Sequence, residues 1–207
     1  VIPRDGTDRN LDTGGYIAGL LTEGNKFLLD QFGYQYQIDS INGDYDIQYF
    51  KSSYTSAYFM SNDNLTGLLA TEIGLPENFS LNRKDYIFFV DVPYLRNGTA
   101  CGYAGMPGIT AIVAVGSGRS SYGTCTGPSL QLQDYASITW VHESVHNLGV
   151  DHVTDDSCDL MRGSGQCSTR WTIDSGHKRY VGASVLGPNL LSLRVWKGHT
   201  SDPGLRA

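Results

Sequence analysis

Two stretches of the chain carry apolar residues at the spacing of an amphipathic helix. In residues 16–32 the apolar positions follow a period of 3.6 residues, which predicts a long helix that ends at Gly33. In the second stretch, apolar residues recur at intervals of three and four and predict a helix over 134–148, with Gly149 placed to end it. Its apolar face consists of Ile138, Val141, Val145 and Leu148.

Other runs have the patterns of strands. Residues 34–39 alternate, residues 46–52 form a second candidate, and the continuous apolar run 85–92 suits a buried central strand. Residues 101–108 and 109–116 predict two strands joined by a turn at Pro107-Gly108. A short helix within 62–76 would end near Gly74. This mixture of helices and strands predicts an α+β fold.

Composition narrows the class of protein. A chain of 207 residues, 40% hydrophobic and 17% charged, suits one globular domain. The net charge is −6 and the basic residues are scattered, which argues against nucleic acid as a partner. No apolar run approaches the ~20 residues that a membrane helix requires, so we expect no membrane partner. We expect a monomer.

Several features indicate an exported protein. The chain starts at Val1 instead of Met, and we interpret it as a processed mature form. Four cysteines and three Asn-x-Ser/Thr sequons, at Asn64, Asn78 and Asn97, fit an oxidising compartment. We therefore expect a secreted, extracellular protein.

Three of the five histidines lie within residues 142–152. His142 and His146 are four apart, so their imidazoles project side by side from one helix. A left-handed Gly149 would turn the chain so that His152 returns to the same point. Three neutral imidazoles leave one coordination position open, which is typical of a catalytic Zn²⁺ site rather than a closed structural one. The alternative is a solvated helix face that happens to be rich in histidine.

Glu143 supplies the acid–base chemistry that such a site needs. It neighbours His142 and is offset by about 100° around the helix. Its carboxylate can take a proton from a zinc-activated water and pass it to the leaving amine. The reaction class that these residues predict is metal-assisted hydrolysis of an amide.

The stretch HESVHNLGVDH, residues 142–152, resembles the zinc-binding signature of the metzincin clan of endopeptidases, and CDLM, residues 158–161, resembles that clan's Met-turn. The resemblance implies that His142, His146 and His152 bind the metal and that Glu143 is the general base and acid. It places Met161 beneath the ion. No tyrosine follows the methionine closely, so no subfamily is assigned.

The resemblance also implies a fold. A twisted, mixed five-stranded sheet would carry a backing helix, here 16–32, and an active-site helix, followed by a small irregular C-terminal lobe. The chain would form one catalytic domain, 1–207, with an N-terminal subdomain of residues 1–152 and a C-terminal subdomain of residues 153–207.

By the same resemblance, Gly102, Tyr103, Ala104 and Gly105 would form a rim strand that pairs with the substrate backbone. An ordinary strand that ends in a turn is the alternative. The walls of a substrate pocket would include Thr139, Arg162, Gly163 and Ser164.

Four cysteines permit three pairings. We favour Cys101 with Cys125, which would hold the glycine-rich loop of residues 116–129 against the sheet, and Cys158 with Cys167, which would staple the Met-turn. Zinc ligation by the thiols is the alternative, but their spacing lacks a Cys-x-x-Cys pair. The acidic stretch 39–46 resembles a calcium loop but lacks the required glycine and closing glutamate, so calcium is unsupported and a solvated loop is the better interpretation.

The sequence thus predicts a secreted zinc endopeptidase that acts on protein or peptide substrates. One alternative is a zinc amidase that acts on cell-wall or other non-protein amides. A second is a non-catalytic, zinc-containing binding or toxin-like module. The intact Glu143 argues against the second, because a structural zinc site does not need it.

Overall fold

A computed structural model describes most of the first three-quarters of the chain and parts of the rest. The described residues are 1–74, 85–118, 123–128, 134–154, 158–163, 167, 170–175, 179–181, 190 and 196–198. Within them the chain forms four α-helices and several short strands, which is the predicted α+β class. The division into subdomains at residue 152 stays a prediction.

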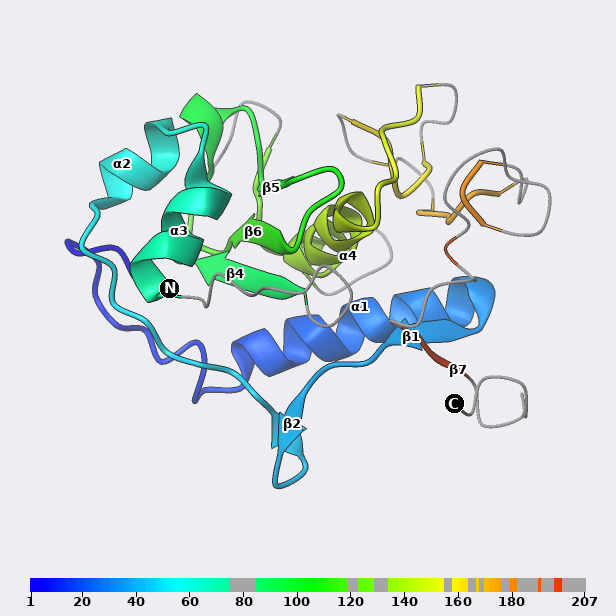
Figure 1. Ribbon diagram of the computed structural model, residues 1–207, viewed down its shortest axis with the longest axis horizontal. Helices are drawn as coiled ribbons and strands as arrows, with labels where there is room; N and C mark the ends of the chain where they lie inside the picture. The colour runs from blue at the N-terminus through cyan, green and yellow to red at the C-terminus, as the bar shows by residue number, and fades with distance from the viewer. Residues whose placement is uncertain are drawn as a thin grey trace.

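A three-stranded sheet lies at the centre of the molecule (Figure 1). Strand β6 (Thr110–Ala114) is its middle strand and is buried along its whole length. β4 (Tyr86–Val90) pairs with it in parallel, from Tyr86 opposite Thr110 to Val90 opposite Ala114. β5 (Gly102–Ala104) pairs with it antiparallel on the other side. The strands predicted at 85–92 and 109–116 are therefore confirmed, but β6 and not β4 is central. The strand predicted within 101–108 is confirmed only over β5.

The five strands that we expected reduce to three in the described part of this sheet. The N-terminal residues border the other edge of β4, and a second short segment pairs with them. The Val1 nitrogen donates to the Phe89 oxygen at 2.7 Å, and Ile2 in turn exchanges hydrogen bonds of 2.9 Å with Phe50 and Ser52. The strand predicted at 46–52 is wrong, because only Lys51 forms a bridge, to Ile2.

Residues 34–45 contribute strands to two smaller sheets, each of two strands. β1 (Tyr34–Tyr36) pairs antiparallel with β7 (Trp196–Gly198), so the strand predicted at 34–39 is confirmed only at its start. β2 (Ser40–Ile41) and β3 (Asp44–Tyr45) form a hairpin around Asn42 and Gly43, both with positive φ. The Asn-Gly pair favours this tight turn. The acidic stretch is thus a β-hairpin.

The sheet carries helices on both faces (Figure 1). Alternate residues of its strands enter two cores, as the period of two requires. Phe88, Val90 and Ile112 pack with α3 (Leu65–Ile73), which follows the short helix α2 (Ser56–Ser61). Val113 packs with α1 (Tyr16–Phe32) and α4 (Tyr135–Asn147). The second core also includes residues of the C-terminal part, among them Leu160, Trp171 and Tyr180.

Helix α1 begins and ends where the apolar period predicted. Gly33 closes it in a left-handed conformation with φ of 83°, and its nitrogen donates to the Leu29 oxygen at 3.0 Å. Its neighbour α4 begins at the cap Asp134, whose carboxylate accepts from the Ala136 nitrogen at 2.9 Å. Trp140 joins the two helices by donating from Nε1 to the Leu20 oxygen at 2.8 Å. α1 thus packs against α4 and fixes its position.

Two disulfides link Cys101 to Cys125 and Cys158 to Cys167, which confirms the predicted pairing. They indicate an oxidising environment. Among the described residues, no helix is long and apolar enough to cross a membrane.

Candidate metal centre and active-site cleft

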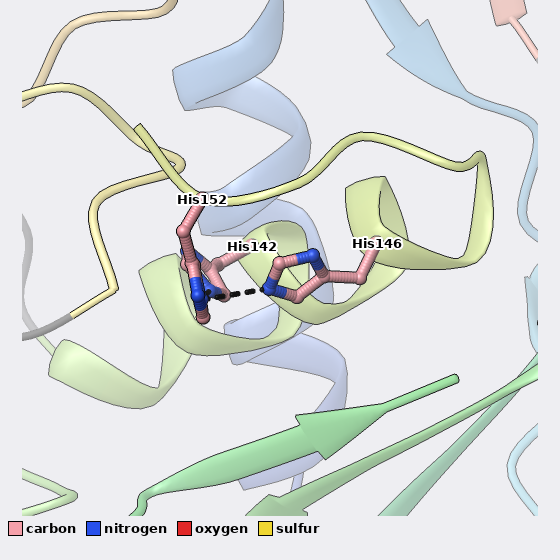
Figure 2. Close-up of side chains that lie close together, drawn as sticks. All are labelled: His142, His146 and His152. Atoms are coloured by element: carbon pink, nitrogen blue, oxygen red, sulfur yellow. Dashed lines mark hydrogen bonds between the residues drawn. The ribbon is translucent and has the colours of Figure 1, made fainter. Parts of the chain in front are cut away.

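The three histidines of the predicted zinc site converge on one point (Figure 2). His142 and His146 stand one turn apart on α4, and His152 comes from the segment that follows. Gly149, with φ of 91°, makes the change of direction between them. The His152 Nε2 lies 3.0 Å from Nε2 of His146 and 3.3 Å from Nε2 of His142.

Backbone carbonyls orient the two helical imidazoles. Nδ1 of His142 lies 2.6 Å from the Leu160 oxygen, and Nδ1 of His146 lies 2.7 Å from the Val150 oxygen. A carbonyl oxygen only accepts, so each Nδ1 carries the hydrogen and each Nε2 keeps its lone pair. Burial also lowers the pKa of both rings, which keeps them neutral. Both are therefore prepared as metal ligands.

The donor set fits a metal ion such as zinc. Three ligand nitrogens lie within 4.8 Å of one another, with no second such group of His, Cys, Asp or Glu in the described part of the chain. Three neutral imidazoles suit Zn²⁺ and leave a position for a reactant. The carbonyl oxygens of Leu160 and Val150 accept from Nδ1 of His142 and His146 and so hold the two rings in the orientation that a metal ion needs.

Glu143 lies in the same cleft as the three histidines. Its side chain is buried, and burial raises its pKa to about 8, against the opposing effect of the Arg96 charge. β5 covers it closely, because a Cβ placed on Gly102 would lie 2.6 Å from the Glu143 Cγ. A carboxyl group in this position can hold or release a proton near neutral pH.

The cleft has a volume of about 360 Å³. It brings together six of the eight residues predicted to bind substrate, namely Gly102, Tyr103, Ala104, Thr139, Arg162 and Gly163. Gly105 is not among the lining residues, although Ala104 and Met106 on either side of it are. Ser164 lies outside the described residues. The substrate-binding role of all eight stays a prediction.

Met161 is fully buried beside the residue that orients His142. Its backbone joins two loops, because the Val153 nitrogen donates to the Met161 oxygen at 2.8 Å. The Met161 nitrogen donates to Oδ1 of Asp159, also at 2.8 Å. The turn is therefore fixed on both sides, and its position beneath a metal ion stays a prediction.

Asp159 holds the loop that carries Met161, and the sequence pattern did not reveal it. It is completely buried, and its carboxylate accepts from Tyr180 Oη at 2.6 Å and from the Asp174 nitrogen at 3.1 Å. Arg179 Nη1 lies 3.4 Å from its Oδ2. The pKa of Tyr180 is raised by burial and by these acids. This network ties the Met161 turn to the C-terminal part of the chain.

Arg96 is a second residue that sequence reasoning missed, and it lines the cleft together with Tyr103. An arginine between apolar strands carries no pattern that marks it as functional, and only its contacts identify it.

Comparison of the chain with protein-family models, with curated proteins and with solved structures found no match.

Proposed function

We propose that this protein is a secreted, zinc-dependent endopeptidase of the metzincin type. The observation that carries the proposal is the convergence of three Nε2 atoms beside a buried glutamate in one cleft. Two of the rings are already held in the ligating tautomer by backbone carbonyls. A helix face that was merely rich in histidine would not need this support.

The order of the elements also supports the metzincin assignment. A long helix backs α4, a glycine follows α4, and a disulfide closes the loop that carries Met161. β5 lies at the end of the sheet and beside the cleft. An extended peptide could therefore add to β5 through main-chain hydrogen bonds. The two disulfides support secretion.

The roles of the residues follow from their positions. His142, His146 and His152 would hold the zinc ion. When bound, zinc supplies Lewis-acid chemistry, which polarises a carbonyl and acidifies water. Glu143 would accept a proton from the water that attacks the carbonyl carbon. As the carbon–nitrogen bond breaks, Glu143 would deliver that proton to the amine, so protons balance over the cycle.

The test is digestion of a diverse peptide library by the wild type and by Glu143→Gln, which keeps the size of the side chain and removes the base. Metal content is measured for both proteins. We expect one zinc in each and cleavage by the wild type alone. Equal cleavage by both, or no cleavage by a zinc-loaded wild type, would overturn the proposal. Hydrolysis of cell-wall amides without peptide cleavage would favour the amidase alternative.

A further inference from the structure

Arg96 is anchored at the cleft by two contacts. Its guanidinium carbon lies 5.1 Å from the centre of the Tyr103 ring, and its Nε donates to Oδ1 of Asp63 at 3.0 Å. Arg96 and Tyr103 both line the cleft. The cation–π contact and the bond at Nε together hold the guanidinium over the Tyr103 ring. Within the described part of the chain, its two terminal nitrogens make no hydrogen bond.

The backbone that carries Arg96 is unusual. Arg96, Asn97 and Gly98 have successive φ values of 50°, 56° and 84°. Residues with a Cβ rarely adopt such values, and they persist only where the surroundings enforce them. Leu95 and Ala100 close the turn with reciprocal hydrogen bonds of 2.8 and 3.3 Å. The turn thus places an arginine at the cleft at a conformational cost.

The charges around the cleft differ from those of the whole protein. The chain has a net charge of −6, but the cleft is lined by two arginines, Arg96 and Arg162, and by two acids, Glu143 and Asp151. A divalent ion on three neutral imidazoles would make the site positive. Such a site attracts an anionic group although the rest of the molecule repels it.

We infer that Arg96 is a specificity-determining residue that selects peptides with an aspartate or glutamate side chain close to the scissile bond. A guanidinium with two free, coplanar terminal nitrogens matches a carboxylate in a forked pair of charge-assisted hydrogen bonds. This inference rests on the proposed function, because it takes the ligand of the cleft to be a peptide.

The first experiment compares cleavage of paired peptides that differ only by Asp against Asn, or Glu against Gln, at each position around the scissile bond. The proteins are the wild type, Arg96→Gln, Arg96→Lys and the control Lys26→Gln. Lys26 pairs with Asp30 on the exposed side of α1, so its replacement removes the same charge at a distance. We expect the wild type and the control to prefer the acidic peptide at one position by roughly tenfold in kcat/KM.

Arg96→Gln should reduce that ratio to about one, and Arg96→Lys should keep part of it, because an ammonium group keeps the charge and loses the fork. No acid preference in the wild type, or an unchanged preference in Arg96→Gln, would overturn the inference.

A second measurement separates this inference from the proposed function. The same paired peptides are titrated onto Glu143→Gln and onto the double variant Glu143→Gln/Arg96→Gln, and the dissociation constants are compared. A binding preference for the acidic peptide that disappears in the double variant supports the role of Arg96 even if the wild type cleaves no peptide. Equal binding of both peptides to Glu143→Gln contradicts the inference even if the wild type is an active peptidase.

Discussion

Gly102 and Gly105 lie at the two ends of one short segment and differ in what surrounds them. A Cβ on Gly102 would lie 2.6 Å from the Glu143 Cγ and 2.7 Å from the Thr139 Cγ2. At Gly105 the nearest atom, the Gly108 Cα, would lie at 3.4 Å, which is ordinary van der Waals contact. Of these two glycines, only Gly102 is needed for the close approach of β5 to Glu143.

We predict that Gly102→Ala lowers kcat/KM for peptide hydrolysis by about 100-fold, because displacement of a catalytic group by about 1 Å has an effect of that size. Zinc content should not change, since Glu143 is not a ligand. Gly105→Ala is the control and should stay within about threefold of the wild type. Similar activities in the two variants would show that β5 does not position Glu143.

Asp159 is a second residue with a measurable role. Its buried carboxylate accepts hydrogen bonds from Met161, Asp174 and Tyr180. Asp159→Asn keeps the shape but removes the charge and one acceptor, so we expect a loss of about 2–4 kcal/mol in the free energy of unfolding. Urea denaturation measures it. Asp30→Asn, at an exposed ion pair of α1, should change the same quantity by less than about 1 kcal/mol.

At this scale the sequence predicted local geometry well. The sequence placed His142 and His146 side by side because about four residues make one helical turn. It also predicted that the chain turns at Gly149, because this glycine follows the last apolar position of the helix. Asp159 and Arg96 could not be identified, because their partners are distant in the chain and only folding brings them together.

Helices α1 and α4 form a unit whose closeness depends on one glycine. Gly24 and Gly19 both lie in α1, where glycine is unfavourable relative to alanine. A Cβ on Gly24 would lie 2.4 Å from Trp140 Nε1, whereas one on Gly19 would have no neighbour within 4 Å. Gly24 is therefore present for packing, which its low helix propensity alone does not indicate.

Substitution of the two glycines should have opposite effects. Gly19→Ala should raise the free energy of unfolding by about 0.5–1 kcal/mol through helix propensity. Gly24→Ala should lower it by about 1–3 kcal/mol, because the Trp140 ring must move and its bond to the Leu20 oxygen is disturbed. Thermal unfolding of both variants is the measurement. A higher free energy of unfolding for Gly24→Ala would contradict the close contact between Gly24 of α1 and Trp140 of α4.

Helices were predicted more accurately than strands for a physical reason. The bounds of α1 and α4 follow from contacts within a few residues, and both matched the apolar period. A strand needs a partner elsewhere in the chain. Residues 46–52 have the composition of a strand, but only Lys51 forms a bridge. β1 stops at Tyr36, where the Asn25 side chain takes the place of a neighbouring strand by bonding to its nitrogen and oxygen.

The stability of the whole molecule should depend on pH through Asp85, at the start of β4. Its Oδ2 is buried without a hydrogen bond in the described structure, and burial raises its pKa from 3.8 to about 6. The folded protein therefore binds this proton more tightly than the unfolded chain. Stability contributed by the neutral form is complete below about pH 4 and is lost as the pH rises through 6.

Asp85→Asn should remove this dependence. We expect it to raise the free energy of unfolding of the metal-free protein by about 1–3 kcal/mol at pH 8 and by less than about 0.5 kcal/mol at pH 4. Urea denaturation at the two pH values measures the difference, with Asp30→Asn as the exposed control. An equal effect at both pH values would show that ionisation of Asp85 is not its cause.

The proposed function requires that the imidazoles of His142, His146 and His152 bind one zinc ion. Anomalous scattering at the zinc absorption edge, from crystals grown with the metal, tests it most directly. We expect one strong peak at about 2.0–2.1 Å from Nε2 of His142, His146 and His152, with Glu143 outside the ligand set. A peak at another group of residues, or none at these three nitrogens, would contradict it.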